Sequence, residues 1–168
     1  MGAELAAPLR FAQPTSRFVA LLVAALAFAS PALAQEGGLR VIDGDTLAIG
    51  TKTYRLFGID APERLQTCVA NDNTWRCGAS ATEALRALIG SGPVDCPPRE
   101  LDRYGRTVAI CYAAGIDLGE AMVAGGWALA YRSFTKMYVP AEESARATEA
   151  GIWSSGFVMP EAWRRGVR

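Results

Sequence analysis

Apolar and polar residues alternate over short stretches separated by turn residues, a pattern typical of strands in a small sheet. Gly50-Thr51 separates two of these stretches, so a tight turn is expected there. A second pair of stretches flanks the polar segment 97–106, which has a turn near Arg103-Tyr104. The pattern predicts five short strands: 39–42, 46–49, 52–57, 94–96 and 107–113.

Helical spacing follows the third strand and returns in the last third of the chain. Ser80 and Glu83 form a capping-box pattern ahead of an apolar stripe, which predicts a helix over 80–90. Asp117 is placed to cap a second helix up to about Gly125, and Pro140 suits the first turn of a third helix over 141–150. The tail, including Trp163-Arg164-Arg165, is expected to be irregular. We therefore predict an α+β fold, a small five-stranded barrel of the oligonucleotide-binding type with three helices packed on it.

The N-terminus has the features of a secretory signal peptide. Arg10 and Arg17 precede the apolar run 18–29, and Ala32-Leu33-Ala34 has the small-residue pattern of a cleavage site. A membrane anchor is the alternative, but the apolar run is short for a bilayer. We expect cleavage after Ala34, a domain spanning 35–168, a periplasmic or secreted location, and no stable membrane association after cleavage.

The net charge and the absence of histidine limit how the protein can bind nucleic acid and which residues can act as a general base. The chain has 17 basic and 17 acidic residues and no histidine. Removing 1–34 takes away Arg10, Arg17 and Glu4, which leaves 15 basic and 16 acidic residues and a net charge of −1. This balance argues against a protein that coats nucleic acid through bulk positive charge. A general base must be a carboxylate, Lys, Tyr or Cys.

All four cysteines follow the predicted cleavage site, and an even number in an exported protein indicates disulfides. Three pairings are possible. We favour Cys68–Cys77, which closes a polar loop, and Cys96–Cys111, which lie symmetrically about the turn near 103–104. A zinc site is the competing interpretation, but the chain lacks both histidine and a C-x-x-C pair.

Three carboxylates and one guanidinium occur within the stretch 45–63: Asp45, Arg55, Asp60 and Glu63. Strands joined by tight turns should bring them together. Two aspartates and the carbonyl of Ala61 offer the oxygen ligands that Ca²⁺ prefers. A carboxylate beside the metal, Glu63, is the plausible base for activating water.

Arginines near this cluster are candidates for binding phosphate. A guanidinium fork holds two phosphate oxygens, which suits Arg55 and Arg106. Arg103 and Tyr104 lie together on the turn of the polar segment 97–106. They could hold a terminal phosphate and stack on a base, and Tyr131 is a weaker aromatic candidate for stacking. Taken singly, Arg55 and Arg106 are each better explained by surface ion pairs, and Arg103 and Tyr104 are equally explained by a solvated turn with a packed tyrosine. The case for Arg55 and Arg106 rests on both occurring beside the acidic cluster.

Three motifs carry a family resemblance: V-I-D-G-D-T at 41–46, R-L-F-G-I-D-A-P-E at 55–63 and D-R-Y-G-R at 102–106. In this order the chain resembles the staphylococcal nuclease-like (thermonuclease) family from about residue 40 to 153. The resemblance implies a barrel with three helices and Ca²⁺-dependent hydrolysis of DNA and RNA that leaves 3′-phosphate ends.

By motif position, the resemblance makes Asp45, Asp60 and the Ala61 carbonyl the metal ligands. It also makes Glu63 the base or water-orienting residue, with Arg55 and Arg106 on the reacting phosphate. The pattern often has Thr at position 61, and well-known members are strongly basic, so this chain departs in both respects.

Two other functions remain open. A barrel of this type can bind nucleic acid or protein without cutting, although such domains usually lose the catalytic residues that are all present here. A phosphodiesterase acting on small nucleotides is mildly favoured by the low net charge. For the leading hypothesis we expect a single-stranded DNA or RNA substrate and a monomer.

Overall fold

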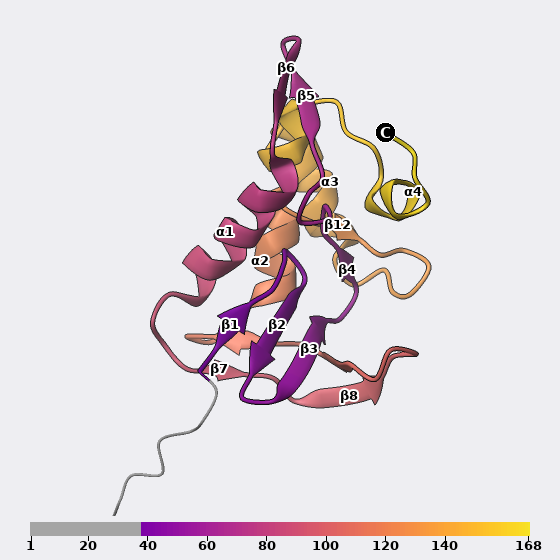
Figure 1. Cartoon of the computed structure of the whole chain (residues 1–168). Helices are drawn as coiled ribbons and strands as arrows, with labels where there is room; N and C mark the ends of the chain where they lie inside the picture. Colours follow the sequence, from indigo (N-terminus) through magenta and orange to yellow (C-terminus); the bar gives the residue numbers. More distant parts are fainter. Residues whose placement is uncertain (1–37) are drawn as a thin grey trace, which may run out of the picture. The chain divides into compact units, whose positions relative to one another are not determined.

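The computed structural model describes residues 38–168, so the predicted signal peptide and the first residues of the predicted domain lie outside the described part. Five strands form the main sheet (Figure 1), in the order β1 (Arg40–Val41), β2 (Thr46–Ile49), β3 (Lys52–Leu56), β9 (Thr107–Ala109) and β8 (Pro98–Leu101). Neighbours are antiparallel except β3 and β9, which run parallel. The tight turn expected at Gly50 joins β2 to β3, and its φ of 61° is one that glycine adopts readily.

The remaining strands pair in three smaller sheets. These are β11 (Ile116–Asp117) with β10 (Tyr112–Ala113) and β7 (Val94–Asp95), β12 (Leu129–Ala130) with β4 (Ile59–Asp60), and β5 (Cys68–Ala70) with β6 (Asn73–Trp75). The described strands thus form separate sheets, and they do not confirm the prediction of one closed five-stranded barrel with three helices. One reason is Gly58, whose φ of 73° turns the chain out of β3 so that β4 pairs with β12 instead.

The described residues contain four α-helices and one 3₁₀ helix, where three helices were predicted. They are α1 (Cys77–Ile89), α2 (Leu118–Ala124), α3 (Val139–Ala147), the 3₁₀ helix η1 (Gly151–Ser154) and α4 (Pro160–Arg164). The first three match the predicted helices in place. The fourth was missed, because one and a half turns beginning at Pro160 are too short to show a helical period. Within the described residues, none of the helices is both long and apolar enough to span a membrane.

Local chemistry explains where α1 and α2 begin. As predicted, the Asp117 carboxylate caps α2 by accepting hydrogen bonds from the amides of Gly119 and Glu120 at 2.8 and 3.2 Å. Helix α1 instead begins at Cys77, three residues before the expected Ser80, and has no side-chain cap. Its first turn is held by the Cys68–Cys77 disulfide and by a 3.1 Å hydrogen bond from the Gly78 amide to the Gln66 carbonyl.

Helix α1 packs against α2, and α2 packs against α3 (Figure 1). Their inner faces meet the sheet in one apolar core, whose fully buried side chains include Leu47, Leu56, Ile59, Leu85, Leu118 and Met122. Both favoured disulfides, Cys68–Cys77 and Cys96–Cys111, are present. The described residues contain no free cysteine, so the zinc interpretation is wrong.

Candidate active site

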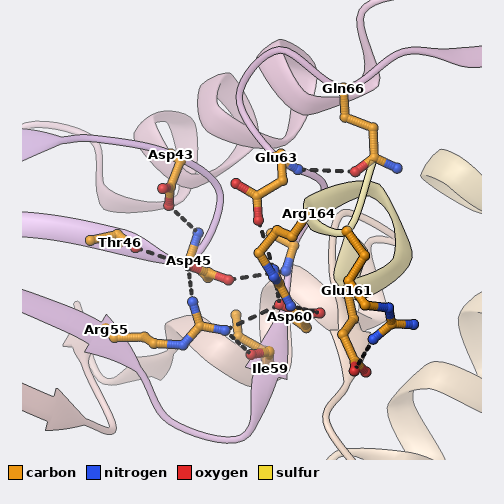
Figure 2. A network of polar contacts seen from close by, with 12 residues as sticks. Asp43, Asp45, Thr46, Arg55, Ile59, Asp60, Glu63, Gln66, Glu161 and Arg164 are labelled. Atoms are coloured by element: carbon orange, nitrogen blue, oxygen red, sulfur yellow. Dashed lines mark hydrogen bonds and ion pairs between the residues drawn. The ribbon is translucent and has the colours of Figure 1, made fainter. Parts of the chain in front are cut away.

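A half-buried guanidinium joins the two aspartates that the sequence predicts as metal ligands (Figure 2). Arg55 donates from Nη1 to Oδ1 of Asp45 at 2.9 Å and from Nη2 to Oδ1 of Asp60 at 3.1 Å. The β2–β3 register places Arg55 opposite Thr46, so its side chain starts beside Asp45. Asp60 ends β4, which brings its carboxylate to the other side of the same guanidinium.

Asp45 is only 4% exposed and its carboxylate is well supplied with donors. Its Oδ2 accepts a hydrogen bond from the Ala61 amide at 3.1 Å, and its Oδ1 accepts one from the Thr46 hydroxyl at 2.9 Å. Asp43 accepts a 3.1 Å hydrogen bond from the Asp45 amide, as a turn-forming aspartate does. The loop 43–45 is therefore built to fix the orientation of one carboxylate.

Burial raises the pKa of Asp45 from 3.8 to about 6. The nearby charges of Asp43 and Asp60 add to this rise, while Arg55 and the Ala61 amide oppose it. For Arg55, burial alone would lower the pKa, but the two aspartates outweigh burial and raise it. Arg55 is thus firmly cationic, and its charge favours the ionised form of the buried Asp45 carboxylate.

Glu63 lies in the loop that follows β4, and hydrogen bonds of its backbone hold this loop in place. The Glu63 amide donates to Oε1 of Gln66 at 3.1 Å, and the Gln66 amide donates to the Glu63 carbonyl at 2.6 Å (Figure 2). Gly78 of α1 packs on the same peptide so closely that a Cβ there would lie 1.7 Å from the Glu63 carbonyl oxygen. The Glu63 side chain remains 35% exposed, so a rigid backbone presents a carboxylate that water can reach.

Arg164 of α4 contacts the carboxylates of Asp60 and Glu63, although the sequence predicts no role for it. It donates from Nη1 and Nη2 to the two oxygens of Asp60 at 2.9 and 3.0 Å, and from Nη1 to Oε1 of Glu63 at 2.7 Å (Figure 2). These contacts raise the pKa of Arg164 although burial would lower it. Asp60 thus pairs with two guanidinium groups at once.

Arg106 lies on the turn 102–106, where Asp102 binds both its side chain and its backbone amide. Its Nε donates to Oδ2 of Asp102 at 2.7 Å, while the Tyr104 and Arg106 amides both donate to Oδ1 at 2.9 Å. The guanidinium carbons of Arg103 and Arg106 lie 4.9 and 5.5 Å from the centre of the Tyr104 ring, which is 69% exposed. The turn therefore presents two cations and one accessible aromatic face.

Tyr131 belongs to an aromatic cluster at the rim of the site. Its ring stacks on Phe134 with centroids 6.2 Å apart, and Phe134 lies 5.3 Å from Phe57. Arg99 covers the Phe57 ring at 4.2 Å. Tyr131 is therefore partly buried and has an aromatic packing partner.

One cleft of about 950 Å³ connects these groups. Apart from Asp60, the predicted catalytic, metal-binding and substrate-binding residues all line it, and Asp60 reaches it through Arg55 and Arg164. The predicted residues on its wall are Asp45, Arg55, Ala61, Glu63, Arg103, Tyr104, Arg106 and Tyr131. Arg106 shares the cleft with the acidic cluster but forms its ion pair with Asp102.

Three contributors were missed from sequence: Gln66, Asp102 and Arg164. Asp102 carried a usable signal, since it opens the D-R-Y-G-R motif four residues before Arg106. Gln66 is fully buried, and nothing in its sequence context marks it. Arg164 lies about one hundred residues from its partners, and no local pattern reports such a contact.

The donor atoms suit a hard cation, although the described residues hold no group of three or more His, Cys, Asp or Glu arranged for a metal. Asp45 and Asp60 both pair with Arg55. Arg164 lies between Asp60 and Glu63 and pairs with both of them. Two carboxylates with water and backbone carbonyls can satisfy Ca²⁺, which takes six to eight oxygens in flexible geometry. The residues therefore fit calcium provided that solvent completes the shell.

Comparison with known proteins decides the family. Residues 53–155 match the family described as "Staphylococcal nuclease homologue". The chain belongs to this family. The match spans Arg55 through Arg106 and the three predicted helices, so the OB-type α+β fold of the family applies to the described part of the chain.

Several relatives match over most of their own length. The succinoglycan biosynthesis protein ExoI of Rhizobium meliloti is 34% identical over 86% of this chain and 79% of its own. An uncharacterized endonuclease of Haemophilus influenzae is 32% identical, over 76% of this chain and 71% of its own. The micrococcal nuclease of Shigella flexneri is 33% identical, over 77% and 80% respectively. Two of these three names specify nuclease activity.

Proposed function

We propose that this protein is an exported, Ca²⁺-dependent nuclease that hydrolyses DNA and RNA and leaves 3′-phosphate ends. One observation carries the proposal: the Arg55 guanidinium, which lines the cleft together with Glu63 and Arg106, bridges two buried aspartates. Membership of the nuclease family and the names of two relatives support it. All charged residues of the three family motifs either line this cleft or, like Asp60, pair with an arginine that lines it.

Asp45 and Asp60 would hold the metal, with the carbonyl of Ala61 as a third ligand. When bound, Ca²⁺ supplies positive charge next to a phosphodiester oxygen and favours deprotonation of a nearby water. The hydrogen bonds from Thr46 and Ala61 to Asp45 fix the carboxylate before any ligand arrives. Such preorganisation is what an electrostatic site requires.

Glu63 would take the proton from the attacking water, since its half-exposed side chain stands on a pinned backbone. Water attacks phosphorus, the bond to the 5′ oxygen breaks, and a proton goes to that oxygen. The products are a 3′-phosphate and a 5′-hydroxyl. Arg55 and Arg106 would bind the non-bridging oxygens, whose negative charge grows during attack.

Arg103 and Tyr104 would hold a flanking phosphate and stack on a base, and Tyr131 would contact another base in the same cleft. The exposed Tyr104 ring and the position of all three residues on the cleft wall support this assignment. Stacking tolerates any base, so we expect little sequence preference, and single-stranded substrates should be favoured because their bases are free to stack.

Export is proposed on two grounds. The first 34 residues have the sequence pattern of a cleaved signal peptide. Both cysteine pairs of the domain form disulfides, which persist in oxidising compartments such as the periplasm or the extracellular space. We propose a monomer without membrane attachment after cleavage.

The decisive experiment measures cleavage of labelled single-stranded DNA and RNA by the oxidised protein, with Ca²⁺ and with chelator. We expect Ca²⁺-dependent cutting, products that polymerase extends only after phosphatase treatment, and a loss of about a hundredfold or more in kcat for Glu63→Gln. Glu161→Gln is the matched control, because Glu161 lines the same cleft but pairs with Arg165.

Each alternative predicts a different outcome. Binding of single-stranded DNA without cutting by the folded, calcium-loaded protein would favour a non-catalytic binding module. Cutting of dinucleotides with no activity on long strands would favour a small-nucleotide phosphodiesterase. Equal activity of Glu63→Gln and the parent would refute the role given to Glu63.

A further inference from the structure

A short arm at the C-terminus, residues 155–168, brings a cation onto the proposed metal ligands. Arg164 donates two hydrogen bonds to the Asp60 carboxylate, from Nη1 to Oδ1 at 2.9 Å and from Nη2 to Oδ2 at 3.0 Å. The same Nη1 lies 2.7 Å from Oε1 of Glu63 (Figure 2). A single side chain thus occupies both oxygens of one proposed ligand and one oxygen of the proposed base.

The arm is attached to the body of the domain and is not a loose tail. The Val158 carbonyl accepts a 2.6 Å hydrogen bond from Nε2 of the fully buried Gln66. Gly156 and Val69 exchange two backbone hydrogen bonds at 2.8 Å each, and Pro160 at the start of α4 is buried. These contacts hold α4 beside β4 (Figure 1).

The residues that anchor the arm lie in or next to one covalently closed loop. Val69 lies inside the loop that Cys68–Cys77 closes, and Gln66 lies just before that loop. Gln66 also binds the Glu63 amide through Oε1, so the side chain that fastens the arm also fastens the Glu63 loop. The arm and the catalytic loop are therefore fixed to each other.

Arg164 and a divalent cation compete for the same atoms. Ca²⁺ bound at Asp60 needs lone pairs that the guanidinium fork uses, and a nearby positive charge repels a second cation. Arg55 already contributes one positive charge to Asp60 from the other side. Because Arg164 is tethered, its effective concentration at Asp60 is high and independent of protein concentration.

We propose that Arg164 is a built-in competitor of the metal, so that Ca²⁺ binds only when the side chain releases Asp60. The C-terminal arm then sets the metal affinity of the site. This inference rests on the proposed function only in taking Asp60 as a metal ligand. Its consequence is a protein that needs a higher Ca²⁺ concentration than its carboxylates alone would require.

Calorimetric titration of Ca²⁺ into the oxidised protein, without nucleic acid, tests the proposal. We expect Arg164→Gln to lower the Kd for Ca²⁺ by about three- to tenfold, since one competing ion pair with a buried partner is removed. Arg165→Gln is the matched control on the next position, where the side chain pairs with Glu161, and its Kd should stay within about twofold of the parent.

A second variant protects the test against misfolding. Arg164→Lys keeps the charge but loses the planar fork, so its Kd should fall less than that of Arg164→Gln. If Arg164→Gln fails to fold, a Kd for Arg164→Lys equal to or above that of the parent overturns the proposal. Equal or weaker Ca²⁺ binding by folded Arg164→Gln overturns it as well.

The proposal and the proposed function can fail separately. A parent that binds Ca²⁺ but cuts no nucleic acid refutes the nuclease and leaves the competition intact. Cutting with unchanged Kd in Arg164→Gln refutes the competition alone. If neither parent nor Arg164→Gln binds Ca²⁺, the calcium site and the competition are both refuted.

Discussion

Asp102 controls the turn 102–106 through its two oxygens. One oxygen accepts the amides of Tyr104 and Arg106, and the other accepts Nε of Arg106. Burial alone would raise the pKa of Asp102, but these hydrogen bonds outweigh burial and lower it. The carboxylate therefore fixes both the backbone of the turn and the direction of one proposed phosphate ligand.

Replacing this carboxylate should affect stability in a pH-dependent way. Because the folded pKa lies below the unfolded value near 4, the ionised Asp102 stabilises the fold above pH of about 4. That stabilisation is lost as pH falls through the folded pKa. We expect Asp102→Asn to lower the free energy of unfolding at neutral pH by about 1 kcal/mol, a modest figure for a surface network.

Urea unfolding at a series of pH values measures this difference. The gap between parent and Asp102→Asn should shrink below pH of about 4, when the parent carboxylate also becomes neutral. Asp95→Asn, at an exposed position of β7, is the control and should show no such gap. A gap that stays constant down to acidic pH would show that the pKa of Asp102 is not lowered by folding.

Among the helices and strands, the sequence predicts those features that depend on residues close together in the chain. The strand pair β2–β3, the cap of α2 and the convergence of Asp45 with Arg55 all follow from neighbours in the chain. The start of α1 does not, because a disulfide and a contact with Gln66 decide it. Arg164 could not be predicted either, since its partners lie about one hundred residues away.

Gly78 is the point where helix α1 meets the catalytic loop. A Cβ at this position would lie 1.7 Å from the carbonyl oxygen and 2.7 Å from the carbonyl carbon of Glu63. Both neighbours are backbone atoms, so no side-chain rotation can relieve the clash. Only glycine lets the helix support the peptide of Glu63 at this distance.

We expect Gly78→Ala to destabilise the fold by about 1–3 kcal/mol or more and to displace Glu63, which lowers kcat. Thermal unfolding and the single-strand cleavage assay would measure the two effects. Gly92→Ala is the control, because a Cβ there meets nothing within 4 Å. Parent-like stability of Gly78→Ala would mean that the Glu63 loop can move away from α1 at little cost.

For the whole molecule, the charge balance limits how nucleic acid is held. The domain after residue 34 carries 15 basic and 16 acidic residues, and several arginines of the cleft are already paired with carboxylates. Long-range attraction of a polyanion should therefore be weak. Binding must rely on the few phosphates that reach Arg55, Arg103 and Arg106, together with stacking on Tyr104.

This arrangement predicts a shallow dependence of binding on salt. Each phosphate contact to a single strand contributes a slope of about −0.7 in a plot of log K against log salt, so three contacts give about −2. Fluorescence anisotropy with Glu63→Gln and single-stranded DNA, from about 50 to about 200 mM salt, measures the slope. Arg106→Gln should make it shallower by about 0.7, whereas Arg40→Gln, on β1 and outside the cleft, should leave it unchanged. A slope of about −5 or steeper would require many more phosphate contacts than the cleft provides, and would place the main binding surface elsewhere on the domain.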